Sequence, residues 1–331
     1  MYSISAKFKM LPAPRLVSRR LALAAAAMML WVLSGSTGGD PRASAGGFSP
    51  VASPTPSAKT RPRHPRAQDP IALPADVPVP RYRPGAPPFA DGETLVYDAS
   101  WIGIPAAEAR ITLAYNRAHP ELWTGQMWIT SSKGVDLLYR MRDYFSENFQ
   151  RESFTPENIY ILQHEKTRRD EWRVTFDHRT HLVTSVKRNA HGRIWTRRFS
   201  GGDPWGPFSG AMMALSQPLK AGQSYTFDVF SGGNRYVFAF PVVKRERIST
   251  ALGTFDTLRI EPSVLWLSEG SFRSQARETT IWVTDDARHL PVRIACAVFI
   301  GEVVADLVKV NNTPAPTHVA ASSAGAKSAD P

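Results

Sequence analysis

Two adjacent carboxylates beside a histidine are the residues of this chain whose types could carry out acid–base chemistry. They are Asp285, Asp286 and His289, in the stretch TTIWVTDDARHLPVRI. A catalytic acid–base pair needs side chains that share a pocket and have perturbed pKa values. Neighbouring residues of a strand point to opposite faces, whereas Asp in a turn bonds to the backbone ahead of it. Because alternating apolar residues flank the stretch, we interpret it as the turn of a hairpin.

The other side chains of catalytic or metal-binding type do not form a recognised set. His178 and His181 lie in DHRTHL, and a metal site there would need a third ligand. Ser209 in GPFSG lacks the glycine two residues away on each side that a nucleophile elbow requires. Cys296, the one cysteine, lies in an apolar alternating run and is interpreted as a buried small side chain. We therefore predict no enzyme activity, no metal site and no cofactor.

Tryptophan and methionine side chains are the candidates for binding an apolar ligand. Large apolar side chains on the inner face of a curved sheet either fill the interior or line a cavity. Methionine adapts its shape to irregular apolar partners. The alternative is that these side chains only close the core. The residues predicted to line such a cavity are Trp101, Trp128, Trp172, Met212, Met213 and Trp282.

The elements that would position these side chains are strands. Apolar residues recur at every second position in EARITLAY, EWRVTFD, RYVFAFPVV and VRIACAVFI, as is typical of antiparallel sheets with one buried face. Turn signals such as DHRTH, SGGN and ALGTF separate the runs. About a dozen short strands at this spacing are typical of a sandwich or barrel. The predicted fold class is all-β, with a single antiparallel, strongly curved sheet or an open or closed β-barrel.

One segment departs from the two-residue period. PFSGAMMALSQPLKAG is rich in Ala, Met and Leu, and Pro218 ends it. Ser209 is expected to cap a short helix over residues 210–217. A helix placed between two parts of the sheet would either plug the mouth of a barrel or cover a concave face.

The N-terminal residues 1–45 have the features of an export signal. A basic stretch precedes the uncharged run LALAAAAMMLWVL, and a small-residue cleavage pattern follows. The apolar run is shorter than the ~20 residues that cross a bilayer. An uncleaved membrane anchor is the alternative interpretation, and the paired arginines of SRRLAL leave twin-arginine export open.

Composition divides the rest of the chain into three parts. Residues 46–88 are rich in Pro, Ala, Ser and Arg, which predicts a disordered or extended linker. Residues 311–331 form a similar low-complexity tail. The β domain is therefore predicted to span residues 89–310.

The formal charge of +11 is concentrated in part at the N-terminus. The first 45 residues hold six basic residues and one acidic residue, and KTRPRHPR in the linker adds a further cluster. A basic arm can contact an anionic surface through charge alone. Because no nucleic-acid-binding motif is present, we predict no nucleic-acid partner, and the membrane surface is the expected contact of the arm.

Four stretches together resemble a known bacterial family. They are GETLVYDASWIGIPAAEARITL, FSGAMMALSQPLKAGQSYTFDVF, ALGTFDTLRIEP and the closing TTIWVTDDARHLPVRI with IGEVVADLV, and the family is domain of unknown function 3108. Ala107 stands where the family often has Gly. The resemblance implies an exported all-β protein of Gram-negative bacteria and gives no catalytic residues. The last strand–turn–strand is also similar to periplasmic lipoprotein carriers, whose open barrels shelter acyl chains.

These observations predict a non-enzymatic periplasmic binding or chaperone-like scaffold for an apolar ligand such as a lipid or acyl chain. Outer-membrane association and inner-membrane anchoring are both compatible with this location. The alternative is a structural or protein-interaction module of the cell envelope. In that case an uncleaved N-terminal segment would tether the β domain, and the proline-rich arm would let it reach an envelope protein partner.

Overall fold

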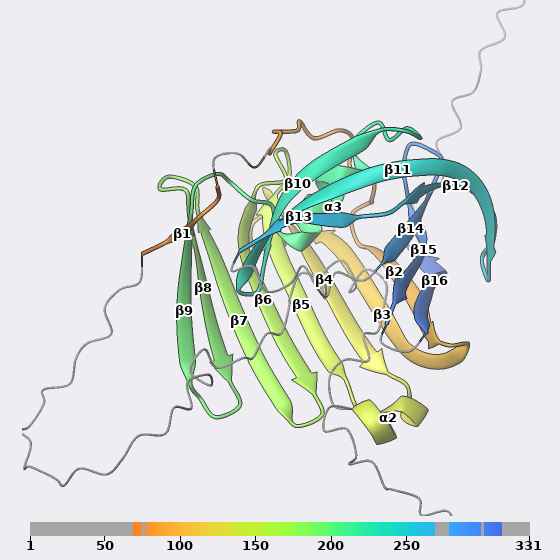
Figure 1. Cartoon of the computed structure of the whole chain (residues 1–331), viewed down its shortest axis with the longest axis horizontal. Coiled ribbons are helices and arrows are strands. Elements are labelled where there is room, and N and C mark those ends of the chain that lie inside the picture. Colours follow the sequence, from red (N-terminus) through yellow and green to blue (C-terminus); the bar gives the residue numbers. More distant parts are fainter. Residues whose placement is uncertain (1–68, 75–76, 78, 269–277, 299–300, 313–331) are drawn as a thin grey trace, which may run out of the picture.

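The computed structural model describes residues 69–74, 77, 79–268, 278–298 and 301–312. The predicted export signal, most of the predicted linker and nearly all of the predicted tail lie outside the described residues. The described chain forms one large curved sheet that does not close, together with two short helices (Figure 1). The prediction of an all-β fold built on a curved sheet is therefore confirmed, and its open form is the one observed.

Eight consecutive strands form an antiparallel meander in the first half of the sheet. Each strand pairs with the next one along the chain. They are β2 (Glu93–Trp101), β3 (Ile104–Tyr115), β4 (Leu122–Ser131), β5 (Arg142–Gln150), β6 (Pro156–Glu165), β7 (Arg168–Asp177), β8 (Leu182–Asn189) and β9 (Ile194–Ser200). Helix α2 (Lys133–Tyr139) connects β4 to β5, and β1 (Ile71–Ala72) pairs in parallel with β9.

The second half of the sheet returns to the first half and pairs with it through β16 and β2. Its path runs through β10 (Ser224–Ser231), β11 (Asn234–Thr250), β12 (Gly253–Ile260), β14 (Thr279–Thr284), β15 (Pro291–Ala297) and β16 (Glu302–Asn311). A further strand, β13 (Ser263–Leu267), pairs with β11 beside this path. Most hydrogen-bonded neighbours are consecutive in sequence, so the sheet is a meander. In sequence, α3 lies between β9 and β10, the strands near the two ends of this path.

Alternating burial explains why these segments form strands. In β7, Trp172, Val174 and Phe176 are buried, while Arg173 and Thr175 between them are exposed. Side chains of a strand point alternately to its two faces, so this pattern places one face of β7 against the core. The two-residue period that predicts the strands is confirmed here.

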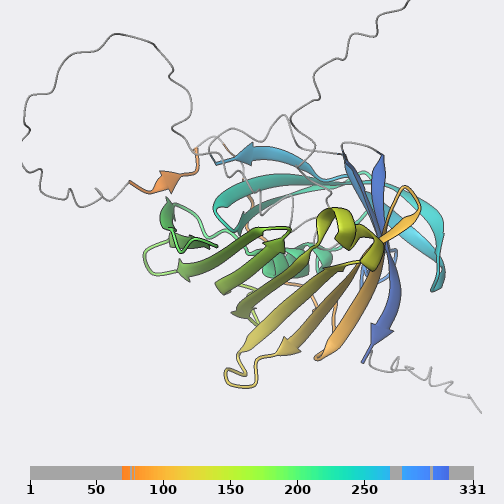
Figure 2. The ribbon, with the colours of Figure 1, turned by 90° about the horizontal axis from the view of Figure 1, so that it is seen from below.

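Helix α3 (Pro207–Leu215) lies between the two halves of the sheet, where it contacts β5 and β10 (Figure 2). Its position agrees with the expected helix, but the expected boundaries and cap are wrong. The N-cap is Gly206, and Pro207 occupies the first helical position, where a missing N–H costs nothing. Ser209 is the third helical residue, and its Oγ accepts a hydrogen bond from the backbone N–H of Gly206 at 2.8 Å.

The end of the predicted linker packs against the β domain. The ring of Tyr82 lies 4.9 Å from the ring of Phe227 and 6.3 Å from that of Trp205. Its hydroxyl oxygen accepts a hydrogen bond from the backbone N–H of Thr226 at 2.9 Å. Ordered packing therefore begins before Phe89, the expected start of the domain.

The two ends of the sheet meet through side-chain hydrogen bonds. Ser185 Oγ of β8 donates to the carbonyl of Gly232 at 2.5 Å. Arg197 Nη1 of β9 donates to the carbonyl of Gly233 at 2.8 Å. The tip of the β10–β11 hairpin is thereby fixed on β8 and β9, although no strand ladder joins these two edges. No helix among the described residues is long and apolar enough to cross a membrane.

Candidate functional site

Charged side chains gather on the concave face of the sheet at the α2 end of β5 to β8. In each strand they lie an even number of positions from the buried apolar residues. Because strand side chains alternate between faces, the charged and apolar groups share the concave face. We call this set the concave cluster; its members are Asp143, Glu165, Arg168, Asp170 and Lys187.

The contacts of the concave cluster come from four neighbouring strands and from α2. Asp143 Oδ1 accepts a hydrogen bond from the backbone N–H of His164 at 2.8 Å. Tyr139, at the end of α2, donates its hydroxyl to Glu165 Oε2 at 2.5 Å. Each carboxylate is therefore held by a group that lies outside its own strand.

Asp170 is the centre of the cationic side of the cluster. It forms ion pairs with the guanidinium of Arg168 and with Lys187 Nζ, the latter at 3.1 Å. The ammonium of Lys187 also lies 4.8 Å from the ring centroid of Trp172 and 5.6 Å from that of Trp195. Lys187 is therefore placed between a carboxylate and two aromatic faces, an arrangement that suits cation–π attraction.

Burial and like charge shift the titration of the cluster. Burial, and next the nearby charge of Glu165, raises the pKa of Asp143 above its usual value. Burial lowers the pKa of Lys187, and its ion pair with Asp170 opposes that shift.

One donor of the cluster is not used. Arg168 Nε donates to Asp170, but Arg168 Nη2 is buried and has no hydrogen-bond partner in the part of the chain that the structure describes. Buried polar atoms are nearly always satisfied, so this N–H group is directed at an acceptor that the described protein atoms do not provide. This unpartnered group belongs to the same strand and the same face as Trp172.

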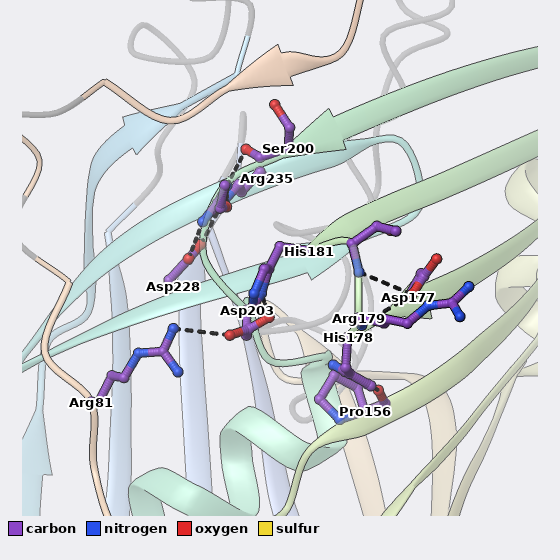
Figure 3. Close-up of polar contacts among 12 residues, drawn as sticks. Arg81, Pro156, Asp177, His178, Arg179, His181, Ser200, Asp203, Asp228 and Arg235 are labelled. Atoms are coloured by element: carbon purple, nitrogen blue, oxygen red, sulfur yellow. Dashed lines mark hydrogen bonds and ion pairs between the residues drawn. The ribbon is translucent and has the colours of Figure 1, made fainter.

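A second polar group joins the loops at the opposite end of the sheet (Figure 3). Arg235 and Asp228 form a buried bidentate pair, with Nε–Oδ1 at 2.8 Å and Nη2–Oδ2 at 2.5 Å. Arg235 Nη1 also donates to the carbonyl of Ser200 at 3.2 Å. Gly202, at a φ of +68°, is required here, since a Cβ would lie 2.6 Å from Arg235 Nη2. Through these hydrogen bonds the pair connects β9 to the β10–β11 hairpin, and we interpret it as structural.

The predicted turn at Asp285 and Asp286 is confirmed. It connects β14 to β15, and Asp286 Oδ1 accepts from the backbone N–H groups of Arg288 at 2.9 Å and His289 at 3.1 Å. Asp285 instead pairs with Arg245, with Oδ2 and Nε 2.5 Å apart. The two carboxylates therefore have separate structural partners and do not form an acid–base pair.

The two histidines of DHRTHL are held by different groups (Figure 3). His178 Nε2 lies 2.7 Å from the carbonyl oxygen of Pro156, and His181 Nδ1 lies 2.6 Å from Asp203 Oδ1. Among the described residues, no group of three or more His, Cys, Asp or Glu side chains is arranged to hold a metal ion. Cys296 is buried in β15, as expected for a small core side chain.

The six side chains predicted to line an apolar cavity lie in different places. Trp172 is on the concave face, and Met212 and Met213 are buried in α3 between the two halves of the sheet. Trp128 is exposed on the outer face, with its ring 5.2 Å from that of Tyr144. The remaining two are both half-buried, Trp101 at the end of β2 and Trp282 in β14, with Trp282 Nε1 donating to Glu246 at 2.7 Å. Their joint role in ligand binding stays a prediction.

Sequence reasoning missed a buried carboxylate that holds α3. Glu147 of β5 is fully buried, and its carboxylate accepts from the backbone N–H groups of Phe208 at 2.7 Å and Ser209 at 3.0 Å. Burial raises the pKa of Glu147 to about 7, while these hydrogen bonds oppose the shift. The signal is present in RDYFSENFQ, where Asp143, Phe145, Glu147 and Phe149 share one face. An acidic residue at an apolar position of an alternating strand could have identified both Glu147 and the concave cluster.

An open, curved, all-β sheet with a buried polar cluster on its concave face defines the class of protein. The chain matches the family model "Protein of unknown function (DUF3108)" over residues 96–308, and it belongs to that family. No curated protein matches the chain.

Two solved structures are similar in part. One is a β-barrel-like protein of the domain of unknown function DUF1849 from Brucella abortus, 8% identical, with a TM-score of 0.46 over 66% of this chain and 97% of that one. The other is described as a "putative lipoprotein" from Parabacteroides distasonis, 10% identical, with a TM-score of 0.29 over 68% of this chain and 99% of that one.

Proposed function

We propose that this protein is a non-enzymatic binding scaffold of the periplasm whose ligand is amphipathic and lipid-like. The observation that carries the proposal is the buried, unpartnered Nη2 of Arg168 on the same concave face as Trp172. The polar group of the ligand would accept a hydrogen bond from Arg168, and its apolar part would lie against the indole rings of Trp172 and Trp195.

The shape of the interior limits where such a ligand would bind. Eight of the nine residues of α3 are buried, so the helix fills the space between β5 and β10. The ligand is therefore assigned to the α2 end of the concave face, where Trp195 remains 37% exposed and gives access from solvent. This location combines a few convergent polar groups with aromatic surface, which is typical of small-molecule sites.

The first test is native mass spectrometry of the purified protein, with lipid extraction of the same sample. A stoichiometric bound lipid is the expected result. If no lipid copurifies, titration with a fluorescent fatty acid and a fluorescent lysophospholipid follows. The absence of binding in both experiments would exclude the proposal and favour a protein-interaction module.

A pair of substitutions on one strand then locates the site. Arg168→Lys keeps the charge beside Asp170 but removes the guanidinium Nη2, so affinity is expected to fall about tenfold, the equivalent of one hydrogen bond of a charged donor. Arg173→Lys is the matched control, because Arg173 is 72% exposed and pairs with Glu171 on the outer face of the same strand. Equal affinities for the two variants would show that the ligand does not contact the concave cluster.

A further inference from the structure

The most exposed large apolar side chains of the described residues belong to three connections of the sheet. Leu137 and Leu138 of α2 are 88% and 69% exposed, and Ile104, Ile102 and Ile194 are 60%, 58% and 55% exposed. The next most exposed large apolar residue is at 45%. Single exposed apolar residues are common on soluble proteins, but a shared location of the five most exposed ones calls for a partner.

Strand register shows that these connections all lie at the same end of the strands. Trp101 pairs with Ile104 where β2 turns into β3, and Thr130 pairs with Arg142 beside α2. Arg188 pairs with Ile194 where β8 turns into β9. This end of the strands appears at the bottom of Figure 1, and Figure 2 views it from below. We call it the rim, defined by Ile102, Ile104, Leu137, Leu138 and Ile194.

Positive charge accompanies the apolar residues along the rim. Residues 188–193, where β8 turns into β9, contain two Arg residues and no Asp or Glu. The carboxylates of the concave cluster at this end are buried, and Asp136 is ion-paired with Arg142. Glu278 and Glu302 are exposed acidic residues at the same end. The exposed cations of the rim are Lys133, Arg140, Lys166, Arg169, Arg188 and Arg193.

We propose that the rim docks the protein on a membrane surface that contains anionic phospholipid. Protruding Leu and Ile side chains would enter the membrane interface. Each Lys or Arg near an anionic leaflet adds favourable energy that salt screens. A flat, deformable surface accommodates apolar groups on three separate connections, whereas a protein partner would need three matching pockets.

Docking at the rim is independent of ligand binding by the concave cluster, because it uses the exposed residues of the connections. The chain enters the sheet at the opposite end of β9, where β1 pairs with Phe199 and Ser200 (Figure 1).

The test measures binding of the full chain to vesicles. Sedimentation with vesicles of phosphatidylglycerol and phosphatidylethanolamine is compared with vesicles of phosphatidylcholine alone. Binding is expected only to the anionic vesicles and is expected to weaken at least tenfold on raising the salt from 50 mM to 500 mM. The triple variant Leu137→Ser, Leu138→Ser, Ile194→Ser is expected to bind at least tenfold more weakly. Because all three side chains are exposed, its thermal unfolding should match that of the unchanged protein.

A site-specific probe separates the rim from the basic arm. An environment-sensitive fluorophore is attached to Leu137→Cys in a Cys296→Ala background, and the matched control carries it at Leu252→Cys, which lies 42% exposed on the β11–β12 turn. A blue shift on adding anionic vesicles is expected at position 137 and not at position 252. Equal shifts at the two positions, or unchanged binding of the triple variant, would overturn the proposal. Binding to phosphatidylcholine as strong as to phosphatidylglycerol would exclude the part assigned to charge.

Discussion

The carboxylate of Glu147 lies 2.7 Å from the backbone nitrogen of Phe208, so a side chain of β5 caps the N-terminus of α3 across the interior of the fold. The other end of the helix is also fixed, because His289 Nδ1 lies 2.8 Å from the carbonyl oxygen of Leu215. The first N–H groups and last carbonyls of a helix have no partners within the helix. Glu147 and His289 provide such partners from two different halves of the sheet.

Removal of the Glu147 side chain should destabilise the fold. Glu147→Ala leaves the N–H groups of Phe208 and Ser209 buried without an acceptor, at a cost of about 1–3 kcal/mol each. We expect the free energy of unfolding in urea to fall by about 2–5 kcal/mol, and Glu147→Gln to lose less because its amide oxygen still accepts. Glu121→Ala, at an exposed position, is the control and should change stability little. A loss as small as that of the control would show that the helix does not depend on this cap.

The raised pKa of Glu147 predicts a pH dependence of stability. Its pKa is about 7 in the folded protein and 4.5 in the unfolded chain, so between these values the folded state holds a proton that the unfolded state has lost. The free energy of unfolding therefore decreases as the pH rises from 4.5 to 7, and the full cost is present above pH 7. The raised pKa of Asp143 acts in the same direction.

Glu147→Gln isolates the contribution of Glu147 to this dependence. The glutamine does not titrate, so we expect a smaller loss of stability between pH 5 and pH 8 than in the unchanged protein. Urea unfolding at the two pH values measures the difference. An identical pH slope in both proteins would show that Glu147 does not take up a proton on folding.

Disruption of the Asp228–Arg235 pair should be among the most costly changes in the fold. Removing one partner leaves an uncompensated buried charge, at about 3–5 kcal/mol. Asp228→Leu and Arg235→Met should each lower the free energy of unfolding by that amount, whereas the double variant Asp228→Leu, Arg235→Met should lose less than the sum. A double-mutant cycle by urea unfolding measures the coupling. Additive losses would mean that the two side chains do not act as a pair.

Close packing at Gly125 predicts a local effect on α3. A Cβ at this position would lie 2.5 Å from Cγ of Phe208, so Gly125→Ala forces the ring to shift, at about 1–3 kcal/mol. Gly134→Ala in α2 is the control, because no atom lies within 4 Å of its Cβ and alanine favours the helix by about 0.5–1 kcal/mol. Thermal unfolding should therefore move in opposite directions for the two variants.

Local patterns in the sequence predict the strands and turns because both depend on neighbouring residues. Alternation in EWRVTFD places Trp172 and Val174 in the core, and Asp286 forms the turn that its side-chain chemistry favours. The short helix α2 was not predicted, although Ser132 caps it by accepting from the backbone N–H of Val135. Seven residues give too little helical periodicity to stand out between two strands.

The sequence does not predict which polar groups of the interior lie next to one another, because segments separated in sequence bring them together. Asp143 and Asp170 share the concave face only because β5, β6 and β7 pair in a fixed register. Likewise, Glu147 acquires its role from α3, about sixty residues further along the chain. Composition places Tyr82 in a linker. Its packing could not be predicted, because the rings that contact it belong to the segment between β9 and α3 and to β10.

Strand β11, from Asn234 to Thr250, pairs with β10 and β13 over its first part and with β12 over its second part. One strand therefore connects the layer over α3 to the wall of the sheet, with a register shift between Val242 and Lys244 where its partner strands change. A hinge between these parts would have to break the backbone hydrogen bonds that β11 forms with its neighbouring strands, so this layer cannot open as an independent lid. Amide hydrogen exchange should therefore be slow in both parts of β11.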